Sequence, residues 1–271
     1  MKKNLLTKLS VLALVGLMTF TGCSKAPMFK EDLKAGDVYV TKASFSQTSE
    51  DYLQGEDTFV FNTEAKYDST ATIGDKDKDK NTAVSVKYDN YSVTYSSPAS
   101  DSAEFVAECN QEGIEECKQI NSVNNALTGR IDSFGILFET TTSPELQENE
   151  SFVSSGVDFL SGTGKLGVVK ENDTWDLKVI YTCSNNEVLN VIYKMKCTKI
   201  DDNKIYVTGI GKASKNGAIY DGKITMEVSR ENVLVSKLTT DLTLTEPSDT
   251  GNPSDKTIYK SHETTETTKK K

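Results

Sequence analysis

Apolar and polar residues alternate with a period of two over long parts of the chain. The clearest case places Leu177, Val179 and Tyr181 at one parity and then repeats that parity from Leu189 to Cys197. Such alternation is typical of strands that bury only one face. We expect antiparallel strands over residues 59–73, 84–95, 177–183, 189–197, 204–211, 218–228 and 233–245. Several of these exceed the usual length of about five to six residues, which favours a strongly curved sheet or half-barrel.

One segment in the middle of the chain has helical spacing instead. Its apolar positions are Ile114, Cys117, Ile120, Val123 and Leu127, and Gly129 follows where a C-cap would stand. Together with residues 103–109, this segment predicts a helical pair. The predicted fold is therefore mainly β (α+β), a long antiparallel curved sheet or half-barrel with a helical segment packed on its concave face.

The N-terminus has the organisation of an export signal. A basic start is followed by an apolar run from Leu5 to Phe20, which is too short to cross a hydrocarbon core of about 30 Å. The small residues Thr21 and Gly22 then precede Cys23, and this order resembles the lipobox of bacterial lipoproteins. The resemblance implies a signal peptide over residues 1–22, cleavage between Gly22 and Cys23, and fatty acyl chains on Cys23. An ordinary secretory signal that ends near a cysteine is the alternative.

A lipidated Cys23 would anchor the chain to a membrane, because two or more buried acyl chains bind almost permanently. Ser24 follows Cys23, and an uncharged residue there resembles the signal for transfer to the outer membrane. We therefore expect a cell-envelope location, at the outer membrane, with the membrane itself as the first partner.

Composition shifts divide the remaining chain. We expect a lipidated tether over residues 23–34, a β-rich domain over 35–245 and a polar tail over 246–271. The tail is rich in Pro, Thr, Ser and Lys, which predicts disorder, although 256–260 is compatible with a weak edge strand. Lys34–Tyr39 echoes Lys170–Trp175, so the domain either has two related halves, about 35–130 and 165–245, or repeats a common turn by chance.

The charge balance argues against one class of partner. The formal net charge is −9, and removal of a signal that contains three lysines would make it −12. A chain of this charge repels phosphate backbones, so we do not expect nucleic-acid binding.

Four cysteines besides Cys23 lie in the expected domain. Cys109 and Cys117 flank an expected loop at Gly113, and we favour a disulfide between them in an oxidising compartment. Cys183 and Cys197 lie on two arms of one hairpin; if its turn is tight, they are too far apart for the ~5.5 Å that a disulfide spans, so we doubt a second bridge and the sequence leaves their bonding open. Four buried free thiols are the alternative.

Five short segments together form a recognisable order: Leu33–Asp37, Val84–Tyr88, Ala126–Gly129, Val169–Trp175 and Asp221–Thr225. With these segments the chain resembles a family of bacterial envelope lipoproteins of unknown function, although Asn172 stands where that family often has Gly. No catalytic or binding residues are assigned in the family, so the resemblance transfers none. By architecture alone, the expected fold is also similar to periplasmic lipoprotein carriers and lipid-binding half-barrels.

The sequence offers little catalytic chemistry. The only histidine, His262, lies in the expected tail, which removes histidine-dependent triads and multi-histidine metal sites from the domain. Asp75–Lys80 alternates Asp with Lys, but Lys80 and Val86 stand where a calcium loop needs Gly and Glu, so we interpret it as a solvated hairpin tip. We expect no catalytic residue, no metal and no cofactor.

The leading hypothesis is a non-enzymatic, membrane-anchored envelope lipoprotein that binds a hydrophobic ligand or an envelope protein. The first alternative is a structural or protein-interaction lipoprotein whose concave face is filled by its own helices. The second is a hydrolase that uses carboxylates alone, for which Glu115–Glu116 and Asp201–Asp202 are the paired acids.

Overall fold

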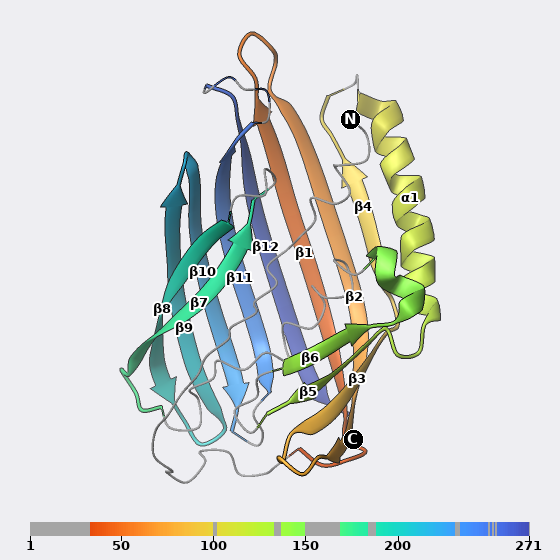
Figure 1. The fold of residues 1–271 in the computed structure, drawn as a ribbon, viewed down its shortest axis with the longest axis vertical. Helices are drawn as coiled ribbons and strands as arrows, with labels where there is room; N and C mark the ends of the chain where they lie inside the picture. The colour runs from red at the N-terminus through yellow and green to blue at the C-terminus, as the bar shows by residue number, and fades with distance from the viewer. Residues whose placement is uncertain are drawn as a thin grey trace.

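The computed structural model describes residues 33–99, 102–132, 137–149, 169–183, 188–230, 234–248, 250, 252 and 254–270. These residues form one antiparallel sheet of twelve strands, in the order β6-β5-β3-β2-β1-β12-β11-β10-β9-β8-β7, with β4 paired to β2 (Figure 1). The strands are β1 (Val38–Tyr52), β2 (Phe59–Lys76), β3 (Thr82–Tyr88), β4 (Ser92–Ser96), β5 (Leu127–Ile131), β6 (Leu137–Thr142), β7 (Thr174–Thr182), β8 (Val188–Ile200), β9 (Lys204–Lys215), β10 (Ala218–Ser229), β11 (Val235–Pro247) and β12 (Lys256–Lys269). The sheet is curved and unclosed, as the alternation predicts.

Alternation along the strands produces two separate apolar clusters on the concave face. In β8, Leu189, Val191, Tyr193, Met195 and Cys197 are buried while the residues between them are exposed. These side chains belong to a cluster over β7–β11, which we call the second cluster. The first cluster covers β1–β5 and includes three mutually packed rings, Tyr67, Tyr88 and Tyr91, with centroids 5.6–5.7 Å apart.

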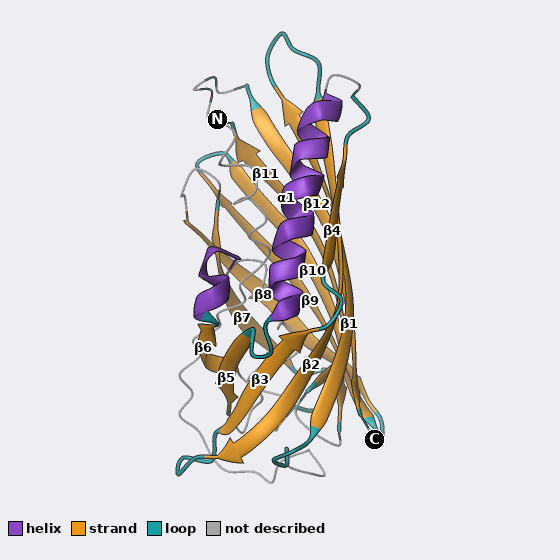
Figure 2. Cartoon of the chain, turned by 90° about the vertical axis from the view of Figure 1, so that its right-hand side faces the viewer, coloured by secondary structure: helices purple, strands orange, loops and turns teal. Residues whose placement is uncertain are grey.

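Among the described residues, one α-helix covers the first cluster. Helix α1 (Ala103–Ser122) runs beside β4 without a break, and a short 3₁₀ helix (Pro144–Asn149) lies near it (Figure 2). The prediction of a helical pair was therefore wrong, because Gly113 lies inside α1, where it allows the helix close to Val93 and Tyr95. The prediction that Gly129 caps the helix was also wrong, since α1 ends at Ser122 and Gly129 lies in β5.

The expected tail is an interior strand. β12 pairs with β1 along fourteen residues and with β11 along eleven, so it lies in the centre of the sheet and joins its two halves. The predictions of disorder over 246–271 and of an edge strand at 256–260 were therefore wrong. The buried positions of β12 are Thr257, Glu263, Thr265 and Thr267, and although Thr favours strands, this polar set leaves little hydrophobic signal.

The two echoing segments form equivalent turns. In the first, Lys34 N–H donates to the Asp37 carboxylate (3.4 Å) and Asp37 N–H donates to Lys34 O (3.0 Å). Lys170 and Asp173 repeat both contacts, each at 3.0 Å. The residue before each Asp has positive φ, 86° at Gly36 and 69° at Asn172. The local geometry repeats, while duplication of the whole halves stays a prediction.

The expected signal peptide, Gly22, Cys23 and the tether up to residue 32 lie outside the described residues. Among the residues that the structure describes, no helix has the length and hydrophobicity needed to cross a membrane.

Candidate functional site on the concave face

A band of polar side chains separates the two apolar clusters on the concave face. It is made of the buried residues Thr41, Ser69, Thr240, Glu263, Thr265 and Thr267, and we call it the polar stripe. Its strands are the four central ones, β11, β12, β1 and β2, whose register places Thr240 beside Glu263 and Thr41 beside both Thr267 and Ser69. Ordinary packing of a sheet would fill such positions with apolar residues.

The polar stripe leaves part of its hydrogen-bonding capacity unused. The hydroxyls of Thr41 and Thr267 bond to each other at 2.9 Å. The hydroxyls of Ser69 and Thr265, in contrast, are buried without a hydrogen-bond partner in the described structure. An unsatisfied buried polar group costs about 1–3 kcal/mol of folding free energy, so a purely structural role does not explain these two hydroxyls.

Glu263 is the one acidic member of the polar stripe. Its side chain is only 4% exposed, and burial raises its pKa from the usual 4.5 to about 7, although a hydrogen bond from Thr240 opposes the shift. The residues that face it from the neighbouring strands are Phe45 and Thr240, and neither is charged. The protonated form of the carboxyl group therefore persists well above its usual pH range, and in that form it can donate as well as accept a hydrogen bond.

Beside Glu263 the concave face becomes accessible. Leu242, Tyr259, Ser261 and Gln47 are only partly buried, and their register makes them neighbours on β11, β12 and β1. We call these four residues the open patch. Leu242 and Tyr259 also pack against the second cluster, so the open patch is continuous with a large apolar surface.

The cysteines do not form the expected bridge. Cys109 and Cys117 are free thiols on one uninterrupted helix, where eight residues separate them by about 12 Å along the axis. That prediction was wrong, because it placed a loop at Gly113. Burial raises the pKa of Cys117 to about 11, so its thiol is unreactive at neutral pH. The backbone N–H of Cys197 donates to the backbone oxygen of Asp173 at 3.0 Å, so Cys197 lies about 30 Å along the strand from Cys183. Both thiols are free, which agrees with the doubt about a bridge between them.

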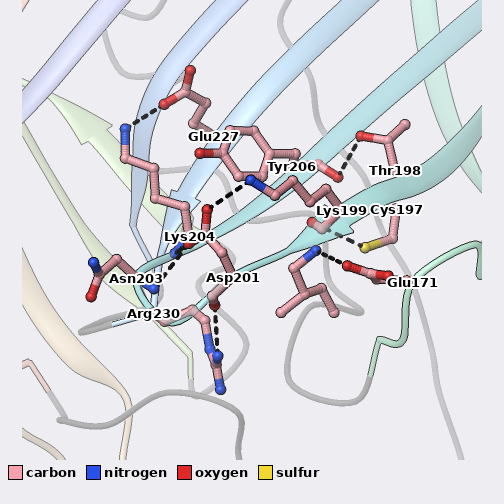
Figure 3. Close-up of polar contacts among 11 residues, drawn as sticks. Glu171, Cys197, Thr198, Lys199, Asp201, Asn203, Lys204, Tyr206, Glu227 and Arg230 are labelled. Carbon is pink, nitrogen blue, oxygen red and sulfur yellow. Dashed lines mark hydrogen bonds and ion pairs between the residues drawn. The ribbon is translucent and has the colours of Figure 1, made fainter.

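Of the pair Asp201–Asp202, Asp201 stabilises the turn before β9 (Figure 3). The Asp201 carboxylate accepts from the backbone N–H groups of Asn203 (3.0 Å) and Lys204 (2.8 Å), and these bonds lower its pKa to about 2. Arg230, which directly follows β10, donates to the backbone oxygen of Asp201 at 2.7 Å and so connects the turn to the end of β10. A carboxylate held in its charged form this way is a poor general acid.

Glu115 and Glu116 are no better arranged. Glu115 pairs with Lys118 on the exposed side of α1 at 2.7 Å, while burial raises the pKa of Glu116. Consecutive helical residues do not face each other, so the two acids do not flank a common site.

The aspartate run and the histidine have structural roles. Asp77 accepts from the backbone N–H groups of Asp79 (2.8 Å) and Asn81 (2.9 Å) at the turn between β2 and β3, as expected for a hairpin tip. His262 lies on the outer face of β12, 2.7 Å from the Asp241 carboxylate. Within the described ranges, no group of three or more His, Cys, Asp or Glu residues is arranged to hold a metal ion.

Sequence reasoning missed Glu263 because it assigned residues 246–271 to a disordered tail. The available signal was the spacing of Thr257, Ser261, Glu263, Thr265 and Thr267, which share one parity across eleven residues.

Comparisons with known proteins give only distant likenesses. No family model matches the chain, and neither does any curated protein sequence. Among solved structures, lipovitellin, described for its lipid–protein interactions, is 8% identical with a TM-score of 0.48; the match covers 87% of this chain and 25% of lipovitellin, so this chain spans about a quarter of that protein. An outer membrane channel from Pseudomonas putida F1 is 7% identical with a TM-score of 0.27, covering 87% of this chain and 97% of the channel.

A third match is the translocator domain of the autotransporter NalP from Neisseria meningitidis. It is 7% identical with a TM-score of 0.20, and the match covers 86% of this chain and 89% of that domain. At such values no residue role transfers from these three structures to this chain.

Proposed function

We propose that the chain is a non-enzymatic envelope lipoprotein, anchored through Cys23, that binds a hydrophobic ligand on its concave face. The observation that carries the proposal is the continuity of the open patch with the second cluster. Leu242 and Tyr259 are partly exposed members of an otherwise buried apolar surface. Ligand sites combine such surfaces with a few polar groups that orient the ligand.

The arrangement of helices supports the choice of this side of the sheet. Within the described part of the chain, α1 packs over β3 and β4, and no helix makes a comparable contact with β7–β11. Among the described residues, the half of the concave face that carries the second cluster therefore draws its apolar side chains mainly from strands, and Leu242 and Tyr259 are only partly buried beside it.

The polar stripe defines the kind of ligand. In the part of the chain that the structure describes, Thr265 has a buried hydroxyl without a hydrogen-bond partner, and Glu263 accepts a bond from Thr240 and is faced on the neighbouring strands by uncharged residues. A ligand with an apolar body and an uncharged or basic polar end satisfies both groups, whereas an anionic end would meet the Glu263 carboxylate. The expected ligand is thus an amphiphile without a net negative head.

The absence of an arranged pair of catalytic acids supports a binding role over hydrolysis. Asp201 is held as an ion by its turn, and Glu115 and Glu116 point apart. A screen of glycoside substrates is expected to give no turnover, and turnover that Glu263→Gln removes would overturn the non-enzymatic assignment.

The test is native mass spectrometry of residues 24–271 after export, a chain that contains every described residue. We expect an added mass that disappears on denaturation and that partitions into organic solvent. Tyr259→Ala is expected to lower the bound fraction, because it removes a ring of the open patch, while Ile258→Ala, one residue away on the outer face, is expected to leave it unchanged. A bare mass in the wild type would reject the ligand and direct the search to protein partners.

A further inference from the structure

The outer face of four neighbouring strands carries most of the exposed aliphatic surface of the molecule. Among the described residues, six large hydrophobic side chains are exposed, and five of these lie on β7–β10. They are Ile180 (59% exposed), Val188 (39%), Ile192 (39%), Ile210 (55%) and Ile219 (54%). The sixth, Ile114, lies on α1.

Lysines alternate with these side chains in both directions. Ile192 on β8 lies directly between Lys178 on β7 and Lys212 on β9. Ile210 on β9 lies between Lys194 on β8 and Lys223 on β10. Each central isoleucine therefore has a lysine opposite it on both neighbouring strands.

We call this surface the lysine–isoleucine face; it comprises the five aliphatic residues, Lys178, Lys194, Lys196, Lys212, Lys223, Asp176 and Asp221. The two aspartates form ion pairs with Lys194 (2.8 Å) and Lys212 (2.9 Å). Five lysines against two aspartates give a local charge of +3, opposite in sign to the −9 of the whole chain.

The other half of the convex surface is different. On β1 and β2 the outward positions hold residues such as Lys42, Ser46, Glu64 and Lys66, and the described residues there include no exposed large hydrophobic side chain. The lysine–isoleucine face is thus a local feature and not a general property of the sheet.

A solvated sheet face is the simplest explanation of such a pattern, because lysine stems can cover neighbouring apolar side chains. Here Ile180, Ile210 and Ile219 remain more than half exposed with the lysines in place. A second copy of the chain fits poorly, since pairing this face with itself would bring like charges together. Five scattered aliphatic side chains also fall short of the ~800 Å² that each partner of a stable protein interface buries.

We propose that the lysine–isoleucine face docks on the surface of a bilayer that contains anionic lipid. Aliphatic side chains enter the boundary between headgroups and acyl chains, while the surrounding lysines contact lipid phosphates. The proposal stands apart from ligand binding on the concave face and does not require acylation of Cys23.

The test is co-sedimentation of residues 24–271 with vesicles, since a chain that begins after Cys23 carries no acyl anchor. We expect binding to phosphatidylcholine vesicles that contain phosphatidylglycerol, little binding to phosphatidylcholine alone, and weakening by salt. Lys178→Glu/Lys223→Glu is expected to reduce the partition coefficient at least about tenfold, because each lysine near an anionic surface contributes to binding. Ile192→Ser/Ile210→Ser is expected to reduce it as well, which purely electrostatic attraction would not produce.

Lys42→Glu/Lys66→Glu is the matched control, because it changes the net charge equally on the other half of the convex surface and is expected to retain more binding. Circular dichroism verifies that each variant keeps its sheet. Equal losses in the two lysine variants, or equal binding to both kinds of vesicle, would overturn the proposal. If the wild type forms a dimer and only the Lys178→Glu/Lys223→Glu variant is monomeric, the face mediates self-association and the proposal is overturned.

Discussion

At the scale of single residues, Glu263 is a carboxyl group that is almost fully buried. Its carboxyl lies in a row with Phe45 and Thr240, and the neighbours at the same face on its own strand are Ser261 and Thr265. Burial costs the carboxylate its hydration, and no positive side chain faces it from the described neighbouring strands, so the protonated form is favoured. The ionised form of this one residue opposes folding.

The stability of the protein is therefore expected to fall between about pH 4.5 and pH 7. The pKa of Glu263 is raised to about 7 in the folded chain, so the folded state retains a proton that the unfolded state has lost. Stabilisation is complete below the unfolded pKa and is lost as the pH rises through the folded pKa, about 3 kcal/mol in all. Glu263→Gln should raise the free energy of unfolding at pH 8 by a similar amount and change it little at pH 4.

Urea denaturation at both pH values measures this difference. Glu266→Gln is the control, because Glu266 lies on the outer face of the same strand and pairs with Lys237 at 3.3 Å. Equal effects of the two substitutions at pH 8 would contradict the assignment of the titration to Glu263.

Glycines on the concave face make room for a tyrosine. A Cβ on Gly211 would lie 2.6–2.7 Å from three ring atoms of Tyr193, whose hydroxyl bonds to that of Tyr220 at 2.7 Å. Because the ring is held at its far end, Gly211→Ala is expected to destabilise the protein by about 1–3 kcal/mol. A Cβ on Gly209 would instead contact the flexible Met195 side chain, so Gly209→Ala should lower the free energy of unfolding by less. Thermal unfolding compares the two, and an equal cost would contradict the role of the Tyr193 ring.

At the scale of secondary structure elements, α1 shows packing overriding intrinsic preference. Gly113 lies in the interior of the helix and is buried against β4. In an isolated helix, Gly113→Ala would be stabilising by about 1 kcal/mol. In the folded protein, the added Cβ would lie 2.7 Å from Val93 Cγ1 and 3.2 Å from Tyr95 Cε2.

Gly113→Ala is therefore expected to destabilise the protein by about 1–2 kcal/mol, since overpacking exceeds the gain in propensity. Gln111→Ala, at an exposed position of the same helix, is expected to be nearly neutral. Chemical denaturation of both variants measures the difference. A more stable Gly113→Ala variant would show that α1 packs less closely on β4 than described.

The elements also show which parts of the fold the sequence could predict. β8 was predicted because Leu189, Val191 and Tyr193 give a strong period of two. β12 was not, because its buried positions include Glu263, Thr265 and Thr267, which carry no hydrophobic signal. Burial of such residues depends on neighbouring strands that lie far away in the sequence, and local pattern does not contain that information.

At the scale of the whole molecule, β12 is the element that unites the two halves. Its hydrogen bonds to β1 and β11 connect the strands that carry the first cluster with those that carry the second. Each half otherwise ends in an unpaired central edge.

Proline within β12 is expected to disrupt the whole sheet. Thr264→Pro removes a backbone donor from a strand that pairs on both sides, and each buried group left unsatisfied costs about 1–3 kcal/mol. Thr264→Ala is the control, since it removes only the side-chain bond to Ser44 at 2.8 Å. We expect a large fall in the urea midpoint for the proline variant and a small one for alanine. A disordered segment would tolerate proline, so equal midpoints would contradict the central position of β12.

The central position of β12 has a consequence for biosynthesis. The chain is synthesised from its N-terminus, so the edges of β1 and β11 that pair with β12 stay unpaired until residues 256–269 have been made. Until then both edges can pair with other chains, and the long separation between β1 and β12 slows correct closure. We therefore expect the nascent chain to be prone to aggregation until β12 has emerged, and a chain shortened before β12 to expose those edges to proteases and chaperones.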